Sequence, residues 1–100
     1  MQPNMKMIQQ MQQRLQKMQE ELGNETVEGS AGGGAVTVSM TGHMKATSVK
    51  IEPSAVDPED VELLEEMVLG ALNDAVQKAQ DLASKRMASV TGGMKIPGLM

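Results

Sequence analysis

The spacing of apolar positions changes along the 100-residue chain, and residues 3–22 show the first of its patterns. Apolar side chains recur there at spacings of three and four, which is typical of an amphipathic helix. This seam consists of Ile8, Met11, Leu15, Met18 and Leu22. Pro3 suits a first helical turn, and Gly23-Asn24 predicts a left-handed cap at the other end. We therefore expect an N-terminal helix over residues 3–22.

Residues 26–52 alternate between apolar and polar side chains, which is typical of half-buried strands. A turn at Gly42-His43 separates two such runs, whose apolar positions are Val36, Val38, Met40, Val49 and Ile51. Before them, Thr26–Glu28 predicts a short first strand, and the glycine-rich residues 29–34 predict a loop or bulged turn. The sum is a three-stranded antiparallel meander with one covered face and one wet face.

The helical period returns in residues 57–89. Asp57 is a good N-cap and Pro58 fits the first helical position, so we place the helix start there. Alanines recur every four residues and permit close contact with a neighbouring element; they are Ala71, Ala75, Ala79 and Ala83. Gly70 is expected to weaken or kink this helix. Residues 91–100 hold three Gly and one Pro, which predicts a loose tail.

Composition changes the picture of the core. The chain has no Phe, Tyr or Trp, and it has 11 Met. Aromatic side chains are the largest single contributors of buried area, so a chain this small is expected to complete its core with a second copy of itself. We expect the core of this homodimer to include Val36, Val38, Met40, Val49, Ile51, Leu64, Val68 and Leu72.

The inventory of reactive side chains argues against an enzyme. The chain has no Cys and a single His, His43, which leaves no set for a metal site and little for acid–base chemistry. A strand pattern follows Gly32–Gly34, whereas a phosphate-binding loop needs a Lys-Ser/Thr pair and a helix. We expect no catalytic residue, cofactor, metal or small-molecule substrate, and we expect His43 to be solvated in its turn.

Acidic and basic side chains are concentrated in different parts of the chain. The net charge is −4, yet residues 52–66 hold seven acids and no base. Lys6, Arg14 and Lys17 share a face of the first helix broadly opposite its apolar seam. Such a basic face is a candidate for phosphate contact. We expect DNA contacts at Lys6, Gln10, Gln13, Arg14, Lys17, Lys85 and Arg86, with Lys78 a weaker candidate.

Four separated motifs resemble the YbaB/EbfC family of nucleoid-associated proteins. The stretch Gly29-x-x-Gly32-Gly33-Gly34-x-Val36-x-Val38-x-x-x-Gly42 resembles that family's loop and strand. Further similar segments are Val49-Lys50-Ile51-Glu52-Pro53, the helix LEEMVLGALNDAVQK over residues 64–78, and the ending Thr91-Gly92-Gly93-Met94-x-Ile96-Pro97-Gly98. The motifs occur in the family's order and span nearly the whole chain.

The resemblance implies an α+β subunit of order α-β-β-β-α that forms a tweezer-like homodimer. It also implies a double-stranded-DNA-binding protein that organises the chromosome, with an effect on gene expression. The longest uncharged apolar run, Met67–Leu72, is far short of the roughly 20 residues of a membrane helix. No signal peptide is visible either, so we expect a cytoplasmic protein of the nucleoid with no membrane partner.

Two other readings of the same residues stay open. The projecting first helix could dock a partner protein, such as a repair or recombination factor, through its apolar seam. RNA binding is disfavoured because the chain has no aromatic side chain on which a base could stack.

Overall fold

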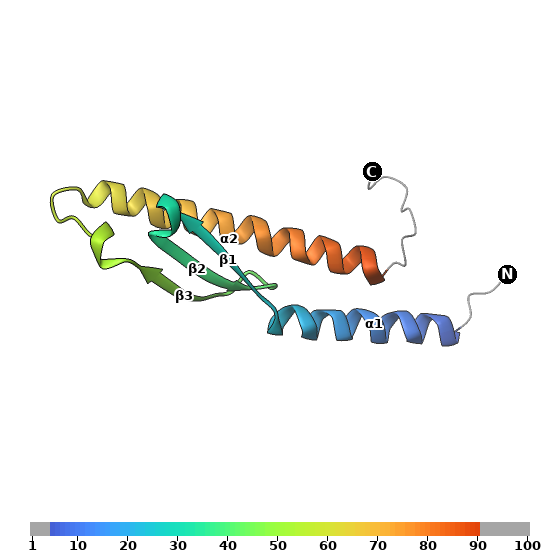
Figure 1. Cartoon of the computed structure of the whole chain (residues 1–100). Coiled ribbons are helices and arrows are strands. Elements are labelled where there is room, and N and C mark those ends of the chain that lie inside the picture. Colours follow the sequence, from blue (N-terminus) through green and yellow to red (C-terminus); the bar gives the residue numbers. More distant parts are fainter. Residues whose placement is uncertain (1–4, 91–100) are drawn as a thin grey trace.

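The computed structural model describes residues 5–90, which form one helix, a three-stranded sheet and a second, longer helix (Figure 1). The elements are α1 (Met5–Asn24), β1 (Thr26–Ala31), β2 (Val36–Thr41), β3 (Ala46–Ile51) and α2 (Val61–Val90). The strands lie in the order β1-β2-β3, and both neighbouring pairs are antiparallel. The α-β-β-β-α order is thus confirmed. The expected loose tail at 91–100 lies outside the described residues.

Helix α1 passes directly into β1. It continues through Gly23 to Asn24, and the N–H of Glu25 still donates to the carbonyl of Glu21 at 2.9 Å. The left-handed cap expected at Gly23-Asn24 is therefore wrong, since neither residue has a positive φ. Glu25 alone separates α1 from β1, so no loop joins the helix to the strand.

Strand β1 is longer than the glycine pattern indicated. Gly29, Ser30 and Ala31 belong to the strand, and Gly29 pairs with Val38 of β2. A Cβ atom on Gly29 would lie 2.2 Å from the backbone nitrogen of Ala75. Gly29 is therefore a spacer that lets β1 lie directly against α2. The turn itself occupies Gly32 to Ala35, and its three glycines all have positive φ.

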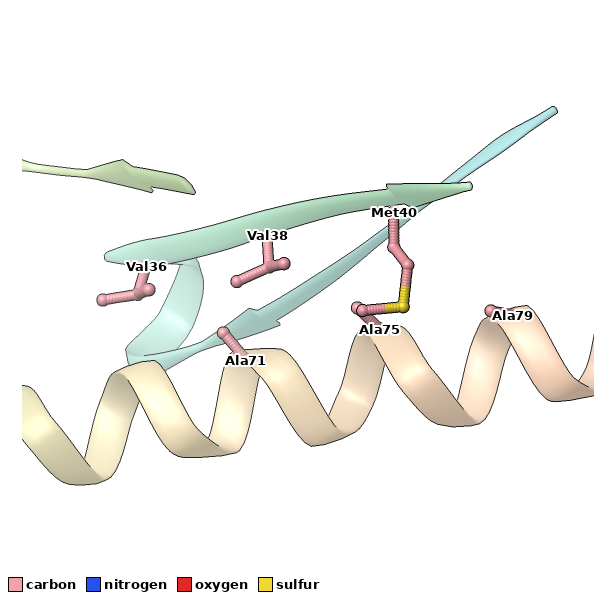
Figure 2. Packing of buried hydrophobic residues seen from close by; sticks show 6 residues of the cluster. All are labelled: Val36, Val38, Met40, Ala71, Ala75 and Ala79. Atoms are coloured by element: carbon pink, nitrogen blue, oxygen red, sulfur yellow. The ribbon is translucent and has the colours of Figure 1, made fainter. Parts of the chain in front are cut away.

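The core lies between β2 and α2. Side chains of Val36, Val38 and Met40 point from β2 toward small alanines on the helix (Figure 2). These are Ala71, Ala75 and Ala79, all fully buried. Alanine every fourth residue keeps one face of the helix shallow, so the backbones of sheet and helix approach closely. The expectation of close contact is confirmed for these three alanines, whereas Ala83 is only partly buried.

The single chain buries only part of the core that the sequence predicts. Leu64 and Val68 are partly buried against the cluster of Figure 2. Val49 is 53 % exposed, Ile51 36 % and Leu72 37 %, so these three are not part of the subunit's own core. The reason is that α2 packs on β1 and β2 and leaves β3 beyond its edge. Their predicted place in a dimer core stays a prediction.

Helix α2 begins later than predicted and is continuous through Gly70. Asp60 is its N-cap, because its Oδ1 accepts from the N–H of Leu63 at 3.2 Å. Asp57 instead forms a turn ahead of the helix, in which its Oδ1 accepts from the N–H of Glu59 at 2.9 Å. Two Asp residues three positions apart present the same cap signal, and placing the start at Asp57 was wrong.

Two side chains of α2 cover the outer edge of β1. The carboxylate of Asp74 accepts from the N–H of Ser30 at 3.0 Å, and the ammonium of Lys78 donates to the carbonyl of Glu28 at 3.0 Å. Asp74 and Lys78 also pair with each other at 3.2 Å. The Ser30 N–H bond, followed by the Lys78 bond, lowers the pKa of Asp74. Together they satisfy edge groups that would otherwise invite another strand.

The lowered pKa of Asp74 predicts how Asp74→Asn should behave. A carboxyl whose pKa is lower in the folded chain adds stability above its unfolded pKa, near 3.8, and loses it as pH falls through the folded value. At pH 7 we expect Asp74→Asn to unfold at a lower urea concentration than wild type. This difference in urea midpoint should disappear once the pH has fallen below the folded-state pKa of Asp74. Urea titrations across pH measure this. A gap that persists unchanged in acid would contradict it.

Candidate nucleic-acid interface

The basic face predicted on α1 is present and exposed. Arg14 and Lys17 are solvent-exposed, as are Lys6, Gln10 and Gln13 along the same helix. Met18 and Leu22 of the apolar seam are buried against the rest of the chain, and Met18 follows Arg14 by one helical turn. The apolar seam therefore docks the C-terminal part of α1, and the basic face is left to water, as its period of 3.6 requires.

A groove of about 260 Å³ lies between α1 and the end of α2. Its lining includes Arg14 and Lys17 from α1 with Arg86 and Ser89 from α2. Two of the expected phosphate-contact residues of the first helix thus meet one from the second. They lie far apart in sequence, and the buried Met18 and the acidic Glu21 line the same groove.

The cations around this groove differ in how they are engaged. Within residues 5–90, Arg14, Lys17 and Lys85 form no ion pair, so their charges face solvent. Lys78, in contrast, is held by Asp74 and the β1 edge and does not line the groove. Free, flexible cations are the side chains that can follow a phosphate backbone.

Arg86 is engaged by two carboxylates. Its Nε donates to Glu25 Oε2 at 3.1 Å, and a terminal nitrogen binds the other oxygen of the same carboxylate. The remaining nitrogen lies 3.8 Å from Glu21 Oε2. The arginine expected to contact DNA thus already has a bidentate protein partner.

The acidic run occupies the other end of the molecule. Residues 52–66 lead into the start of α2, at the opposite end of the helix from the groove (Figure 1). Acids there also suit the positive end of the helix dipole. The acidic run and the cations of the groove therefore lie at opposite ends of the molecule, although the net charge of the chain is negative.

Comparison with known proteins identifies the family. The model of the YbaB/EbfC DNA-binding family matches residues 1–94. The chain belongs to the YbaB/EbfC DNA-binding family. The resemblance seen in the four sequence motifs is therefore confirmed.

Relatives of this YbaB/EbfC chain are named nucleoid-associated proteins. One from Pelotomaculum thermopropionicum is 55 % identical over 95 % of this chain and 90 % of its own length. Another, from Chloroflexus aurantiacus, is 56 % identical over 91 % of each chain. The crystal structure of an uncharacterized protein from Helicobacter pylori covers 86 % of this chain and 90 % of its own, with a TM-score of 0.75 and 22 % identity. It shows the same fold.

Sequence reasoning missed three contacts at the C-terminal end of α1 in this YbaB/EbfC fold. Glu21 and Glu25 bind Arg86, and His43 Nε2 lies 2.7 Å from the carbonyl oxygen of Gln19. A carbonyl only accepts, so the ring donates this bond. The partners are 24 to 65 residues apart, and no local spacing signals such pairs.

The described part of this YbaB/EbfC chain holds neither a metal-binding cluster nor a membrane-spanning helix. Between residues 5 and 90, no group of three acidic, His or Cys side chains could hold a metal ion. Among the helices of residues 5–90, none is long and apolar enough to cross a membrane.

Proposed function

We propose that this protein is a nucleoid-associated homodimer that binds duplex DNA through its α1 basic face, organises the chromosome and thereby affects gene expression. The observation that carries the proposal is the groove at which exposed, unpaired Arg14 and Lys17 gather. Because the chain belongs to a DNA-binding family, DNA is the ligand that we expect these cations to bind. No step of the proposed function is catalytic, and its place in the cell is the cytoplasmic nucleoid.

The acidic end of the rod supports one orientation on DNA. Residues 52–66 are repelled by phosphates, and the α1 basic face is attracted to them. Phosphate contacts fix position without reading sequence, so binding should be similar on unrelated duplexes. Gln10 and Gln13 lie on α1 beside these cations and can add hydrogen bonds to phosphates.

We propose that a second copy of this chain covers an apolar strip along β3 and α2. Register pairs Val38 with Val49 and Val36 with Ile51, so Val49 and Ile51 share the buried face of the sheet. Leu72 of α2 is likewise exposed, at 37 %. Apolar side chains on a core-facing side that the chain's own helix does not cover are typical of an interface between subunits.

The apolar strip predicts opposite results for two neighbouring residues. Val49→Lys should shift the protein from dimer to monomer, because an ammonium would be buried without a partner. Ser48→Lys, on the other face of the same strand, should leave the dimer intact. Light scattering after size exclusion measures both against twice the chain mass of 10.7 kDa. A wild-type monomer at micromolar concentration would contradict the homodimer.

DNA binding itself is tested by a mobility-shift titration with random duplex DNA at two salt concentrations. We expect retarded complexes at low salt and markedly weaker binding at the higher salt, because phosphate binding releases counterions. The absence of binding at low salt would overturn the proposal.

A second candidate function is docking of a partner protein by α1. The observation in its favour is the apolar surface at the start of this helix, where Met5 is 69 % and Met7 66 % exposed. Ile8 and Met11 extend it along the seam. A protein that binds no DNA at low salt, and whose Ile8→Lys variant loses a repair or recombination factor that wild type retains, would favour this function.

A further inference from the structure

We propose that Arg86 and Glu25 form a joint that fixes the angle of α1, and that Arg86 serves DNA binding as a positioning residue without touching phosphate. The inference rests on the proposed function, since it concerns how the α1 basic face is presented. It changes the role expected of Arg86 from the sequence, where charge and position alone made it a phosphate contact.

The joint lies where α1 leaves the body. Glu25 is the only residue between α1 and β1, so rotation of its backbone changes the direction of the whole helix. Of the α1 side chains, only Met18 and Leu22 are buried, and both lie near its C-terminal end. The cations Arg14 and Lys17 lie further from Glu25 than Met18 and Leu22 do, so a small rotation at Glu25 displaces them more than it displaces the buried end of the helix.

Two residues of the β2–β3 turn, Gly42 and His43, hold the end of α1 on one side. The N–H of Gly42 donates to the carbonyls of Leu22 at 2.9 Å and Glu25 at 3.1 Å. His43 adds its bond to Gln19. A Cβ atom on Gly42 would lie 2.7 Å from the Leu22 oxygen, so this contact requires glycine. All of these bonds come from one turn.

Arg86, on α2, restrains the end of α1 from the other side. Its guanidinium binds both oxygens of the Glu25 carboxylate, and Glu21 lies one helical turn earlier on the same acidic side. A planar guanidinium against a carboxylate sets orientation as well as distance. The end of α1 is thus held from the turn and from α2. Removing either Glu25 or Arg86 leaves the turn as the main polar restraint.

The charges around the joint separate the two roles of Arg86. Two carboxylates surround its single positive charge, so the three groups together present a net negative charge. Simple electrostatics therefore predicts that removing the Glu25 carboxylate strengthens DNA binding. The positioning role predicts that the same change weakens it.

The test compares Glu25→Ala with Glu20→Ala, which removes the same charge from an exposed residue of α1. Fluorescence anisotropy with a random duplex should show binding weakened about fivefold in Glu25→Ala and in Arg86→Ala, a size within the range of ion-pair effects. Glu20→Ala should bind at least as well as wild type. The exchanged pair Glu25→Arg with Arg86→Glu should recover to within about twofold.

A Glu25→Ala variant that binds DNA as well as Glu20→Ala, while Arg86→Ala binds weakly, would overturn the proposal and make Arg86 a phosphate contact. Failure of the exchanged pair to recover any binding would count against the joint as well. Circular dichroism checks that each variant is folded.

A DNA-free measurement keeps failure of the joint distinct from failure of the proposed function. The chain has no Cys, so spin labels at Gln9→Cys and Gln80→Cys report the α1–α2 distance cleanly. Labelled chains diluted into unlabelled protein give one labelled copy per dimer. We expect one narrow distance distribution in wild type and Glu20→Ala, and a broader one in Glu25→Ala and Arg86→Ala. Identical distributions in all four would refute the joint even where DNA binds.

Discussion

Changing Lys6, Arg14 and Lys17 together to Ala is expected to remove most of the salt dependence of DNA binding and leave the fold intact. Each phosphate neutralised on duplex DNA contributes about −0.9 to the slope of log affinity against log salt. When both copies of a dimer engage all three residues, the triple change should flatten the slope by up to about five units. The loss should be alike on unrelated duplexes, because phosphates carry no sequence information.

The control for this triple variant is Lys45→Ala with Lys50→Ala. These two changes remove positive charge from the β2–β3 turn and β3, away from the groove lining. Exposed-surface changes should alter the free energy of unfolding by about 0.5 kcal/mol each at most. Binding is measured by anisotropy across a salt series, with circular dichroism for the fold. A well-folded triple variant with the wild-type slope, or equal flattening in the control, would contradict the account.

Gly29→Ala is expected to destabilise the fold by about 3 kcal/mol or more, at the upper end of what overpacking costs. The added Cβ would lie 2.2 Å from the Ala75 nitrogen and 2.4 Å from the Ala71 oxygen. Both are backbone atoms of a continuous helix, so no side chain can rotate away. Strand β1 and helix α2 would have to separate, and the packing of the alanine stripe would be lost with them.

The same chemical change at Gly70 should have the opposite sign. A Cβ on Gly70 would lie 3.4 Å from the Ala31 Cβ, an ordinary contact, and a glycine inside a helix costs about 0.5–1 kcal/mol relative to alanine. Gly70→Ala should therefore stabilise the protein. Urea unfolding at one fixed protein concentration measures both variants. Equal effects of the two changes would show that the close approach of β1 to α2 does not support the fold.

The helices and the central strand could be predicted because their side-chain periods extend over many residues. Met18 and Leu22, at the C-terminal end of the seam, and the alternating Val36, Val38 and Met40 match what the structure buries. Such periodic signals sum over an element, so one exception does not erase them. Boundaries depend on single residues, which is why the helix start moved from Asp57 to Asp60.

Gly29 shows why local rules failed for β1. Glycine is depleted in strands, so a glycine-rich stretch indicates a loop. Here the residue is required by the backbone of Ala75, which lies 46 positions further along the chain. Tertiary contact overrode local propensity, and no window of neighbouring residues contains that information.

The candidate site was predictable in part for the same reason. Arg14 and Lys17 share a helix face, and spacing alone places them together. The partner of Arg86 is Glu25, which is 61 positions away, so its engagement follows only from the docking of α1 on α2. Exposure of Val49 and Ile51 likewise depends on which strands α2 covers.

Site-specific photo-crosslinking tests the central claim most directly. A photoreactive group is attached through Gln13→Cys, on the basic face of α1, or through Glu62→Cys, in the first turn of α2. The account predicts DNA adducts from position 13 with both of two unrelated duplexes, and only background from position 62. Adducts from position 62 that equal or exceed those from position 13 would contradict it.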